Sequence, residues 1–389
     1  FAPPIPQPTP SQEEQNPVGA DVDIDLGDFE APVVQEEPQF DDVFAAESKP
    51  AFRAAFVGCG QAGGKLVEAF YDLGYRRVCA VNTTSQDLAE LKLPVAAKLD
   101  LGGRGAAKDP EVAAKAVAGR DEDVFDLFTR NWGPDVDYVL VCMAAGGGTG
   151  AGIYETVVKV AGTYFEKIGR PVKVGVITAL PKSTEGARPA ANACVVLDKL
   201  KASKLSPIIL VDNERIEQLH PRLSIAKFFK QANDAVAKQF HLLNRLAAQS
   251  SEHASFDAAE FGSLLDSGLV TFGAQKVDNW HEATAVAKAV RTQLQKTLLV
   301  PVDATTASAA SLVFVVGEAI HDEVPRTSLD DGFAALNRIM PGATLFSGIY
   351  KGKGSVLLAF TMLGGLTWPT EKLDALRKSA GSLRVSASA

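Results

Sequence analysis

Two acidic side chains near the middle of this sequence have the types and spacing of groups that activate water. Asp257 and Glu260 are three residues apart at an expected helix start, so both carboxylates would lie on one helix face. Such a pair can orient and polarise a water molecule and help to hold a cation. The same pattern also fits a plain helix start, in which Ser255 caps the helix and the acids favour its N-terminus.

A glycine-rich segment at residues 146–152 could bind phosphate. It has five glycines in seven positions, between an expected strand and an expected helix. Successive backbone N–H groups in such a loop form a nest for negative oxygen atoms, and a threonine adds a hydroxyl donor. A Walker P-loop is excluded because no Gly-Lys-Ser/Thr follows. The predicted cradle, which lacks the usual lysine, consists of Gly146, Gly147, Gly148, Thr149, Gly150, Ala151 and Gly152.

A second glycine loop follows the first expected strand. Gly58, Gly60 and Gly63 fit the pattern G-x-G-x-x-G, with a periodic helical stretch after them. Glycines let the backbone approach a phosphate, and the helix N-terminus supplies free N–H groups. An isolated match could also be a plain tight turn. A Rossmann dehydrogenase is disfavoured because the next strand ends in Asn82-Thr83 rather than in an acid for a ribose.

Strand and helix signals alternate from residue 52 onward, which predicts an α/β fold with a mostly parallel, Rossmann-like sheet covered on both faces. Strands are expected at 54–57, 77–81, 138–143, 172–178 and 208–211, and helices at 65–73, 106–118, 152–165 and up to 204. A long helix is expected at 225–246. The strands expected at 311–316, 343–349 and 355–362, with a helix at 330–340, indicate a smaller α+β domain. The expected domains are 51–224, a central helix at 225–248, and 249–368.

The two ends of the chain have a different composition. Residues 1–50 hold twelve Asp or Glu, one Lys and nine of the 21 prolines. The formal charge is therefore −11 in this tail and +3 in the rest of the chain, which gives the net charge of −8. Such a segment cannot bury enough surface to fold, and a disordered acidic tail is expected. It could be a docking peptide for an adaptor protein or a solvating leader. Residues 369–389 are expected to be a frayed tail.

Composition excludes several classes of protein. A chain of 389 residues with 46% hydrophobic and 22% charged residues is typical of a soluble protein with two domains. No run of about 18 apolar residues predicts a membrane span, and no secretory signal is expected, so a cytoplasmic location is predicted. The four cysteines lack metal spacing and are expected to be free, mostly buried thiols. No basic patch suggests direct nucleic-acid binding by the core.

Seven loop segments resemble, in the same order, the nucleotide loops of the tubulin/FtsZ superfamily of GTPases. Residues 146–152 resemble the tubulin signature, with Ala151 at a Ser/Thr position. The other six are residues 58–63, including Gln61 and Ala62; 80–86, including Asn82 and Thr83; 101–112, including Gly105, Ala106 and Ala107; 184–188, including Glu185 and Arg188; 212–216, including Asn213; and 229–234, including Phe229 and Asn233. The resemblance covers about residues 52–365.

The resemblance implies the tubulin/FtsZ fold and a bound GTP or GDP with Mg²⁺; the metal ligands are left open. It implies that Glu185 contacts the ribose and that Arg188 lies on the sugar–phosphate side. Asn213 and Asn233 would read the guanine, and Phe229 would stack on it. Lys182 is a further phosphate-side candidate, but no family motif carries it and a solvated loop charge is the favoured interpretation.

The resemblance also implies a GTPase that polymerises head to tail with itself. Asp257 and Glu260 would then act on the GTP of the next subunit, although Ser255 replaces the family's Asn. A division role and a role in positioning plasmid or viral DNA both stay open, and a divergent bacterial or viral member is favoured. The alternative is a structural protein that keeps its nucleotide without hydrolysing it.

Overall fold

The computed structural model describes residues 49–381 except 223, 252 and 283. The acidic tail predicted at 1–50 lies outside the described residues, apart from Lys49 and Pro50. The end of the chain, 382–389, lies outside them too.

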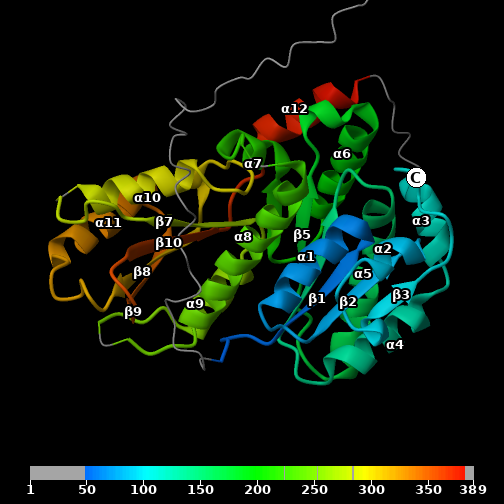
Figure 1. Cartoon of the computed structure of the whole chain (residues 1–389), viewed down its shortest axis with the longest axis horizontal. Helices are drawn as coiled ribbons and strands as arrows, with labels where there is room; N and C mark the ends of the chain where they lie inside the picture. The colour runs from blue at the N-terminus through cyan, green and yellow to red at the C-terminus, as the bar shows by residue number, and fades with distance from the viewer. Residues whose placement is uncertain (1–48, 223, 252, 283, 382–389) are drawn as a thin grey trace, which may run out of the picture. The chain divides into compact units, whose positions relative to one another are not determined.

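Six parallel strands form the sheet of the first domain (Figure 1). They are β1 (Ala54–Cys59), β2 (Val78–Asn82), β3 (Lys98–Asp100), β4 (Tyr138–Ala144), β5 (Val174–Leu180) and β6 (Ile208–Asp212). Their order is β3-β2-β1-β4-β5-β6, and every neighbouring pair is parallel. The chain therefore moves outward from β1 in one direction and from β4 in the other. In such sheets, ligands bind beyond the carboxyl ends of the strands at this switch point.

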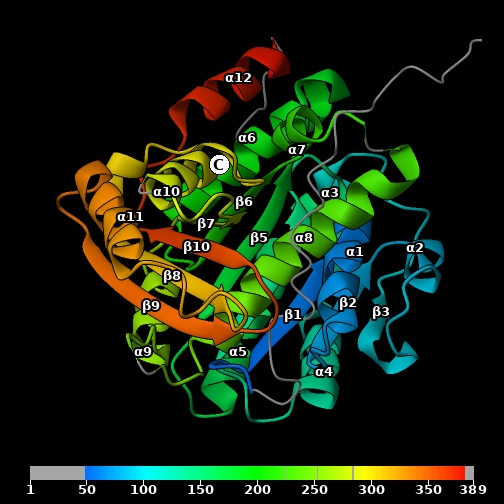
Figure 2. The same cartoon turned by 60° about the vertical axis from the view of Figure 1, so that its left-hand side comes forward.

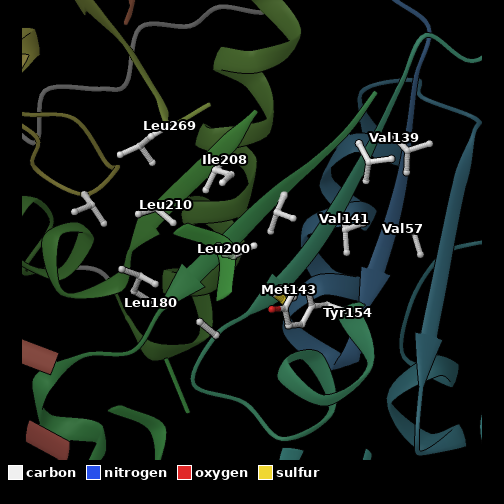
Figure 3. Packing of buried hydrophobic residues seen from close by; sticks show 14 of the residues in the cluster. Val57, Val139, Val141, Met143, Tyr154, Leu180, Leu200, Ile208, Leu210 and Leu269 are labelled. Atoms are coloured by element: carbon white, nitrogen blue, oxygen red, sulfur yellow. The ribbon is translucent and has the colours of Figure 1, made fainter. Parts of the chain in front are cut away.

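The central strands are buried on both faces, which explains their continuous apolar sequences. In β4, Val139, Val141 and Met143 face one core together with Val57 and Tyr154 (Figure 3). The alternate residues of β4 belong to the core on the other face.

Helices cover both faces of this sheet. The first core contains residues of α4 (Asp121–Trp132), α5 (Thr149–Lys167) and α6 (Ala187–Ala202). The second contains residues of α1 (Gly60–Asp72) and α8 (Ile225–Leu246). Shorter helices lie between strands: α2 (Ser85–Ala89), α3 (Pro110–Val117) and α7 (Asn213–Leu219).

Helix α8 has the bounds expected from the sequence and connects the two domains (Figure 2). Its Phe240 packs edge-on against Phe56 of β1 and Phe70 of α1, with ring centroids 6.1 and 5.9 Å away. The same ring lies 6.1 Å from Phe261 of α9 (Ala258–Leu265), which belongs to the second domain.

The second domain contains a four-stranded mixed sheet, ordered β7-β10-β8-β9. Its strands are β7 (Val270–Lys276), β8 (Ala309–Gly317), β9 (Thr344–Gly352) and β10 (Leu357–Gly364). Helices α10 (Ala285–Gln295) and α11 (Arg326–Ile339) belong to the same domain. Three strands and α11 confirm the expectations, whereas β7 and α10 were not expected.

The last part of the described chain corrects the prediction of a frayed tail. Residues Thr370–Ala380 form helix α12, whose Leu373, Leu376 and Ala380 are buried. Arg377 of α12 pairs with Asp198 of α6 at 3.2 Å. The segment is an amphipathic helix, in which Arg377 and Lys378 are exposed on the side away from the buried leucines.

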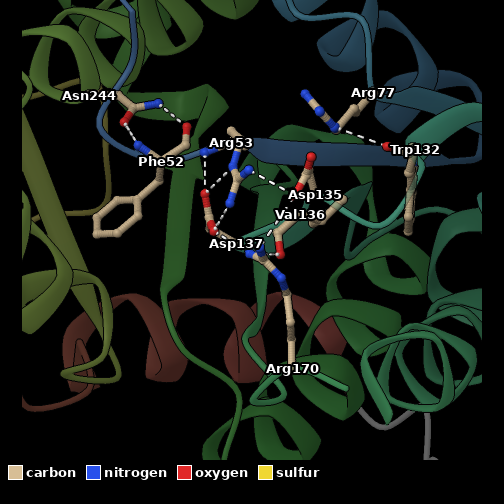
Figure 4. Close-up of polar contacts among 9 residues, drawn as sticks. All are labelled: Phe52, Arg53, Arg77, Trp132, Asp135, Val136, Asp137, Arg170 and Asn244. Atoms are coloured by element: carbon tan, nitrogen blue, oxygen red, sulfur yellow. Dashed lines mark hydrogen bonds and ion pairs between the residues drawn. The ribbon is translucent and has the colours of Figure 1, made fainter. Parts of the chain in front are cut away.

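An ion-pair network lies at the amino ends of β1 and β4 (Figure 4). Arg53 contacts Asp137 at 3.0 Å and Asp135 at 3.0 Å, and Arg170 contacts Asp137 at 2.7 Å. Burial alone would raise the pKa of Asp137, but hydrogen bonds from Arg53 and Arg170 outweigh it and lower that pKa. The network therefore holds Asp137 in its charged form at the start of β4.

No helix among the described residues is long and apolar enough to cross a membrane. All four cysteines are free thiols, as predicted; Cys59, Cys79 and Cys142 are buried and Cys194 is half-buried.

Candidate functional site

The two glycine loops meet at the switch point of the parallel sheet, where β1 and β4 end side by side. A Cβ atom added to Gly60 would lie 3.0 Å from the backbone nitrogen of Gly150, so the loops are in contact. Gly60 also has a φ of 72°, which a residue with a side chain rarely adopts. The sequence placed a loop at 58–64, but helix α1 already begins at Gly60. Gln61, Ala62 and Gly63 therefore belong to its first turn.

The N-termini of α1 and α5 share a property that suits an anion. Neither has a side-chain cap, and neither has an acid in its first turn. The first N–H groups of a helix have no partner within the helix, and the helix dipole adds a positive partial charge there. By contrast, Asp109, Asp212 and Asp257 cap helices α3, α7 and α9 with their carboxylates. The two helix starts beside the switch point are thus open toward a phosphate.

The glycines of residues 146–152 do not all leave room for a ligand. A Cβ atom on Gly148 would lie 2.7 Å from the backbone nitrogen of Asp109 and 2.9 Å from the Cβ of Ala106. Gly148 is therefore required by the close approach of residues 105–109. Gly147 is half-exposed, and its Cβ would meet only the Ala144 oxygen, at 3.5 Å. It is the position of this loop where a side chain would enter open space.

The end of β2 joins the same site. The hydroxyl groups of Thr83 and Thr149 lie 2.9 Å apart. The side chain of Asn82 donates to Asp87 at 3.0 Å and accepts from the Thr83 N–H at 2.7 Å. Asn82 therefore fixes the turn that aims Thr83 at the start of α5.

The segment that contains Gly105, Ala106 and Ala107 has an unusual backbone. Ala107 and Lys108 have φ angles of 46° and 60°, and left-handed residues with side chains are uncommon. The helix expected at 106–118 begins only at Pro110, because the preceding residues form a turn and Asp109 then caps the helix. The turn follows β3 and packs against Gly148.

Helix α6 holds this turn through two side chains. Arg188 pairs with Asp109 at 3.0 Å and donates to the Lys108 carbonyl at 3.2 Å. Asn192, one turn further along, donates to the Lys108 carbonyl at 3.0 Å and to the Gly146 carbonyl at 3.3 Å. Sequence reasoning missed Asn192, although its spacing of four from Arg188 predicts a shared helix face.

The residues expected at the ribose and the base lie beyond the ends of β5 and β6. Glu185 belongs to a single 3-10 turn (Ser183–Glu185), where its side chain accepts from the Lys182 N–H at 3.0 Å. Asn213 is the first residue of α7. Phe229 and Asn233 lie in the first half of α8, and Phe229 is 56% exposed, which is high for a large apolar side chain. The Lys182 ammonium lies 5.8 Å above the ring of the adjacent Phe228.

The amide side chains of Asn213 and Asn233 make no hydrogen bond to another residue that the structure describes. They can each offer a donor and an acceptor to a base edge. Together with the exposed Phe229 ring, they form a set of groups that could recognise an aromatic, polar ligand.

The two acids are not brought to this site. Phe261 of α9 packs against Phe52 with ring centroids 5.8 Å apart, and Asp266 at the end of α9 accepts from the Tyr138 hydroxyl at 2.8 Å. Phe52 precedes β1 and Tyr138 begins β4, so α9 lies at the amino ends of these strands. A strand the length of β1 separates the two ends by about 17–20 Å. Asp257 and Glu260 thus lie at the end of the domain opposite the glycine loops.

Both acids take part in capping α9. Asp257 accepts from the Glu260 N–H at 2.9 Å, and Glu260 accepts from the Asp257 N–H at 3.3 Å. The capped helix start considered from the sequence is therefore present, with Asp257 rather than Ser255 as the cap. Burial raises the pKa of Glu260, an effect that its hydrogen bond from Asp257 reduces. Asp257 is exposed, so its carboxylate remains accessible to a second molecule.

No group of three His, Cys, Asp or Glu side chains that could hold a metal occurs among residues 49–381 as far as the structure describes them. The donors at the glycine loops are backbone N–H groups and a hydroxyl, which suit an anion rather than a cation.

Comparison with known proteins relates this arrangement to one family. Residues 53–221 match the family described as Tubulin/FtsZ family, GTPase domain. The chain is 28% identical over 279 residues to cell division protein FtsZ 1 of Pyrococcus woesei, covering 70% of this chain and 71% of that protein. It is 30% identical over 224 residues to cell division protein FtsZ 2 of Halobacterium salinarum, covering 56% of this chain and 53% of that protein.

Solved structures show the same fold. A GTPγS-form protofilament of TubZ from Bacillus thuringiensis serovar israelensis has a TM-score of 0.73 at 18% identity, covering 86% of this chain and 92% of that one. A GTPγS-bound protofilament of CetZ2 from Haloferax volcanii has a TM-score of 0.70 at 21% identity, covering 84% and 97%.

Proposed function

Because this chain belongs to the tubulin/FtsZ superfamily, we propose that it binds GTP and hydrolyses it between adjacent subunits of a head-to-tail filament. The observation that carries the proposal is the placement of the two glycine loops and of Asp257 and Glu260 at opposite ends of one parallel sheet. A single subunit cannot bring these groups together, whereas a second subunit stacked end to end can. The related TubZ and CetZ2 structures are protofilaments, which supports this arrangement.

The open N-termini of α1 and α5 would bind the phosphates through backbone N–H groups. Phe229 would stack on the guanine, and Asn213 and Asn233 would read its edge, while Glu185 would contact the ribose. Arg188 already pairs with Asp109, so in this proposal it acts by holding the turn at 105–109 against the phosphate site. A Mg²⁺ bound with GTP would take most of its oxygen ligands from phosphates and water.

Hydrolysis of GTP requires positioning and electrostatic stabilisation from the protein rather than covalent catalysis. Hydrolysis needs a water molecule held in line with the terminal phosphate and a favourable environment for the charge that develops. Asp257 and Glu260 of the next subunit would orient that water, and the backbone N–H groups of the glycine loops would stabilise the charge. Closure of the contact between subunits would thus complete the active site.

A second candidate is a structural protein that keeps GTP or GDP without hydrolysing it. The engagement of Asp257 and Glu260 in a helix cap favours it, because their carboxylates already have a role in α9. Filaments with either activity could serve cell division or the positioning of DNA in the cytoplasm.

Phosphate release at a series of protein concentrations tests the proposal, with sedimentation as a parallel measure of assembly. A shared active site requires turnover per subunit to rise with assembly. Constant turnover at dilutions where no oligomer sediments would rule out the shared site. Filaments that sediment with GTP but release no phosphate would establish the second candidate.

A further inference from the structure

We propose that Lys372 of helix α12 is a positioning residue for the base side of the nucleotide site, an inference that rests on the proposed GTP binding. Its ammonium lies 2.8 Å from Asp212 Oδ1 and 2.9 Å from Glu214 Oε2 (distances are to Nζ). The Lys372 side chain is 10% exposed, whereas most lysines extend into solvent. This contact joins the last described helix to the start of α7, about 160 residues earlier in the chain.

The carboxylates that Lys372 binds determine where Asn213 lies. Asp212 is buried and ends β6, and its Oδ1 also accepts from the Glu214 N–H at 3.1 Å, which caps α7. Asn213 lies between these two acids as the first residue of that helix. Without the ammonium, two neighbouring carboxylates would repel each other in a partly dry environment, and the cap would lose its counter-charge.

The same lysine is linked to the segment that contains Glu185. Glu214 accepts a hydrogen bond from the Ser183 hydroxyl, and Ser183 begins the 3-10 turn that ends at Glu185. Lys372 therefore connects both segments that would contact the ribose and the base, through one intervening carboxylate.

The charges of the triad fit this role. Burial alone would lower the pKa of Lys372, but the two carboxylates raise it, and the hydrogen bonds of Glu214 to Ser183 and Lys372 lower the pKa of that carboxyl. The shifts of Lys372 and Glu214 both favour the charged forms of this pair.

Arg377 provides a matched control on the same helix. It joins α12 to α6 through Asp198, but its side chain is 53% exposed, and its ion pairs with Asp198 and Asp374 do not involve the acids that Lys372 binds. Arg377→Met therefore removes an ion pair that α12 makes with a different helix, α6, and leaves Asp212 and Glu214 untouched.

The test is competition between a labelled GTP and unlabelled GTP or ITP, which lacks the 2-amino group of guanine. The variants are Lys372→Met, Lys372→Arg and Arg377→Met. Lys372→Met is expected to weaken GTP binding by about tenfold and ITP binding by less, because a small displacement of an orienting group is costly. Lys372→Arg should recover most of the GTP preference, and Arg377→Met should behave as wild type.

Two results would overturn the inference while leaving the proposed function intact: wild-type GTP affinity in Lys372→Met, or an equal loss for GTP and ITP. Failure of the wild type to bind GTP would instead defeat the proposed function. Should Lys372→Met fail to fold, Glu214→Ala removes the link to Ser183 at a side chain that is 30% exposed. It should show the same selective loss of GTP, and an unchanged GTP-to-ITP ratio would overturn the inference.

Discussion

The hydroxyl groups of Thr83 and Thr149 lie 2.9 Å apart and join the end of β2 to the first residue of α5. Strand β2 and strand β4, which precedes α5, are not neighbours in the sheet, because β1 lies between them. The contact therefore spans the switch point of the sheet and fixes the distance between the loops on either side of it.

Replacing either hydroxyl should destabilise the fold. Thr83 is 1% exposed, so Thr149→Val leaves a buried hydroxyl without its partner, at a cost of about 1–3 kcal/mol. Thr149 is half-buried, so Thr83→Val should cost less. The double variant should cost little more than one single variant, because no unpaired hydroxyl remains. Urea denaturation of the four proteins checks this. Strictly additive losses would mean that the pair contributes nothing as a pair.

Gly147→Asp should abolish GTP binding and leave the fold intact. The added Cβ meets only the Ala144 oxygen at 3.5 Å, so the chain itself accommodates it. Its negative charge would occupy the region where phosphates are expected and would repel them. Labelled GTP and thermal denaturation together measure the two effects.

Gly162→Ala is the control for that variant. Gly162 lies in the interior of α5, the helix that follows the loop of Gly147, and a Cβ there meets only Val172 at 4.0 Å. It should bind GTP normally and gain about 0.5–1 kcal/mol of stability from helix propensity. Wild-type GTP affinity in Gly147→Asp would show that the phosphate cradle is elsewhere.

Asp257→Asn and Glu260→Gln should separate catalysis from helix capping. Asparagine caps helices about as well as aspartate, and glutamine can also complete a capping box, so α9 should stay folded. Losing the charge should reduce hydrolysis by roughly ten- to a thousand-fold. GTP affinity of the isolated subunit should not change, because both acids lie at the far end of the sheet.

Asp303→Asn is a suitable comparison for these two variants. Asp303 caps a short 3-10 turn (Ala304–Thr306) through the Thr305 N–H, so the same chemical change is made at a cap outside the proposed site. Hydrolysis should be unaffected there. Equal rates of GTP hydrolysis in Asp257→Asn and wild type would contradict a catalytic role for Asp257 and favour a purely structural role for these acids.

Low pH should remove the stabilisation that Asp137 provides at the start of β4. The pKa of Asp137 is lowered in the folded protein, so its contribution is complete above the ordinary Asp pKa of about 3.9 and is lost as pH falls through the folded value. Asp137→Asn should cost about 1 kcal/mol near neutral pH, a modest amount because the network is partly exposed. The difference from wild type should vanish in strong acid, as measured by denaturation at several pH values.

The parallel sheet and its two glycine loops could be predicted because their signals are local. Five of its six strands are short apolar runs, and each glycine loop directly follows one. β3 was not expected, because its sequence is Lys-Leu-Asp. The long amphipathic period of α8 likewise gave its bounds. β7 was missed because Gly273 and Gln275 interrupt its apolar pattern.

Contacts between distant segments could not be predicted. Nothing in the sequence near Arg188 indicates that Asp109 pairs with it, or that Gly148 is a glycine because residues 105–109 press against it. The Lys/Arg-rich sequence of α12 resembled a solvated tail, because the acids that bind Lys372 lie near residue 212. Only the fold brings these partners together.

The opposite placement of the acids and the glycine loops makes the two tips of a filament chemically different. At one tip, a nucleotide would face solvent with no neighbour to cleave it. At the other, a subunit would present acids that have nothing to act on. Replacement of spent GDP by fresh GTP would therefore be confined to the first tip, and growth and turnover would have a direction built into each subunit. Labelled GTP added to preformed filaments should appear at one tip only.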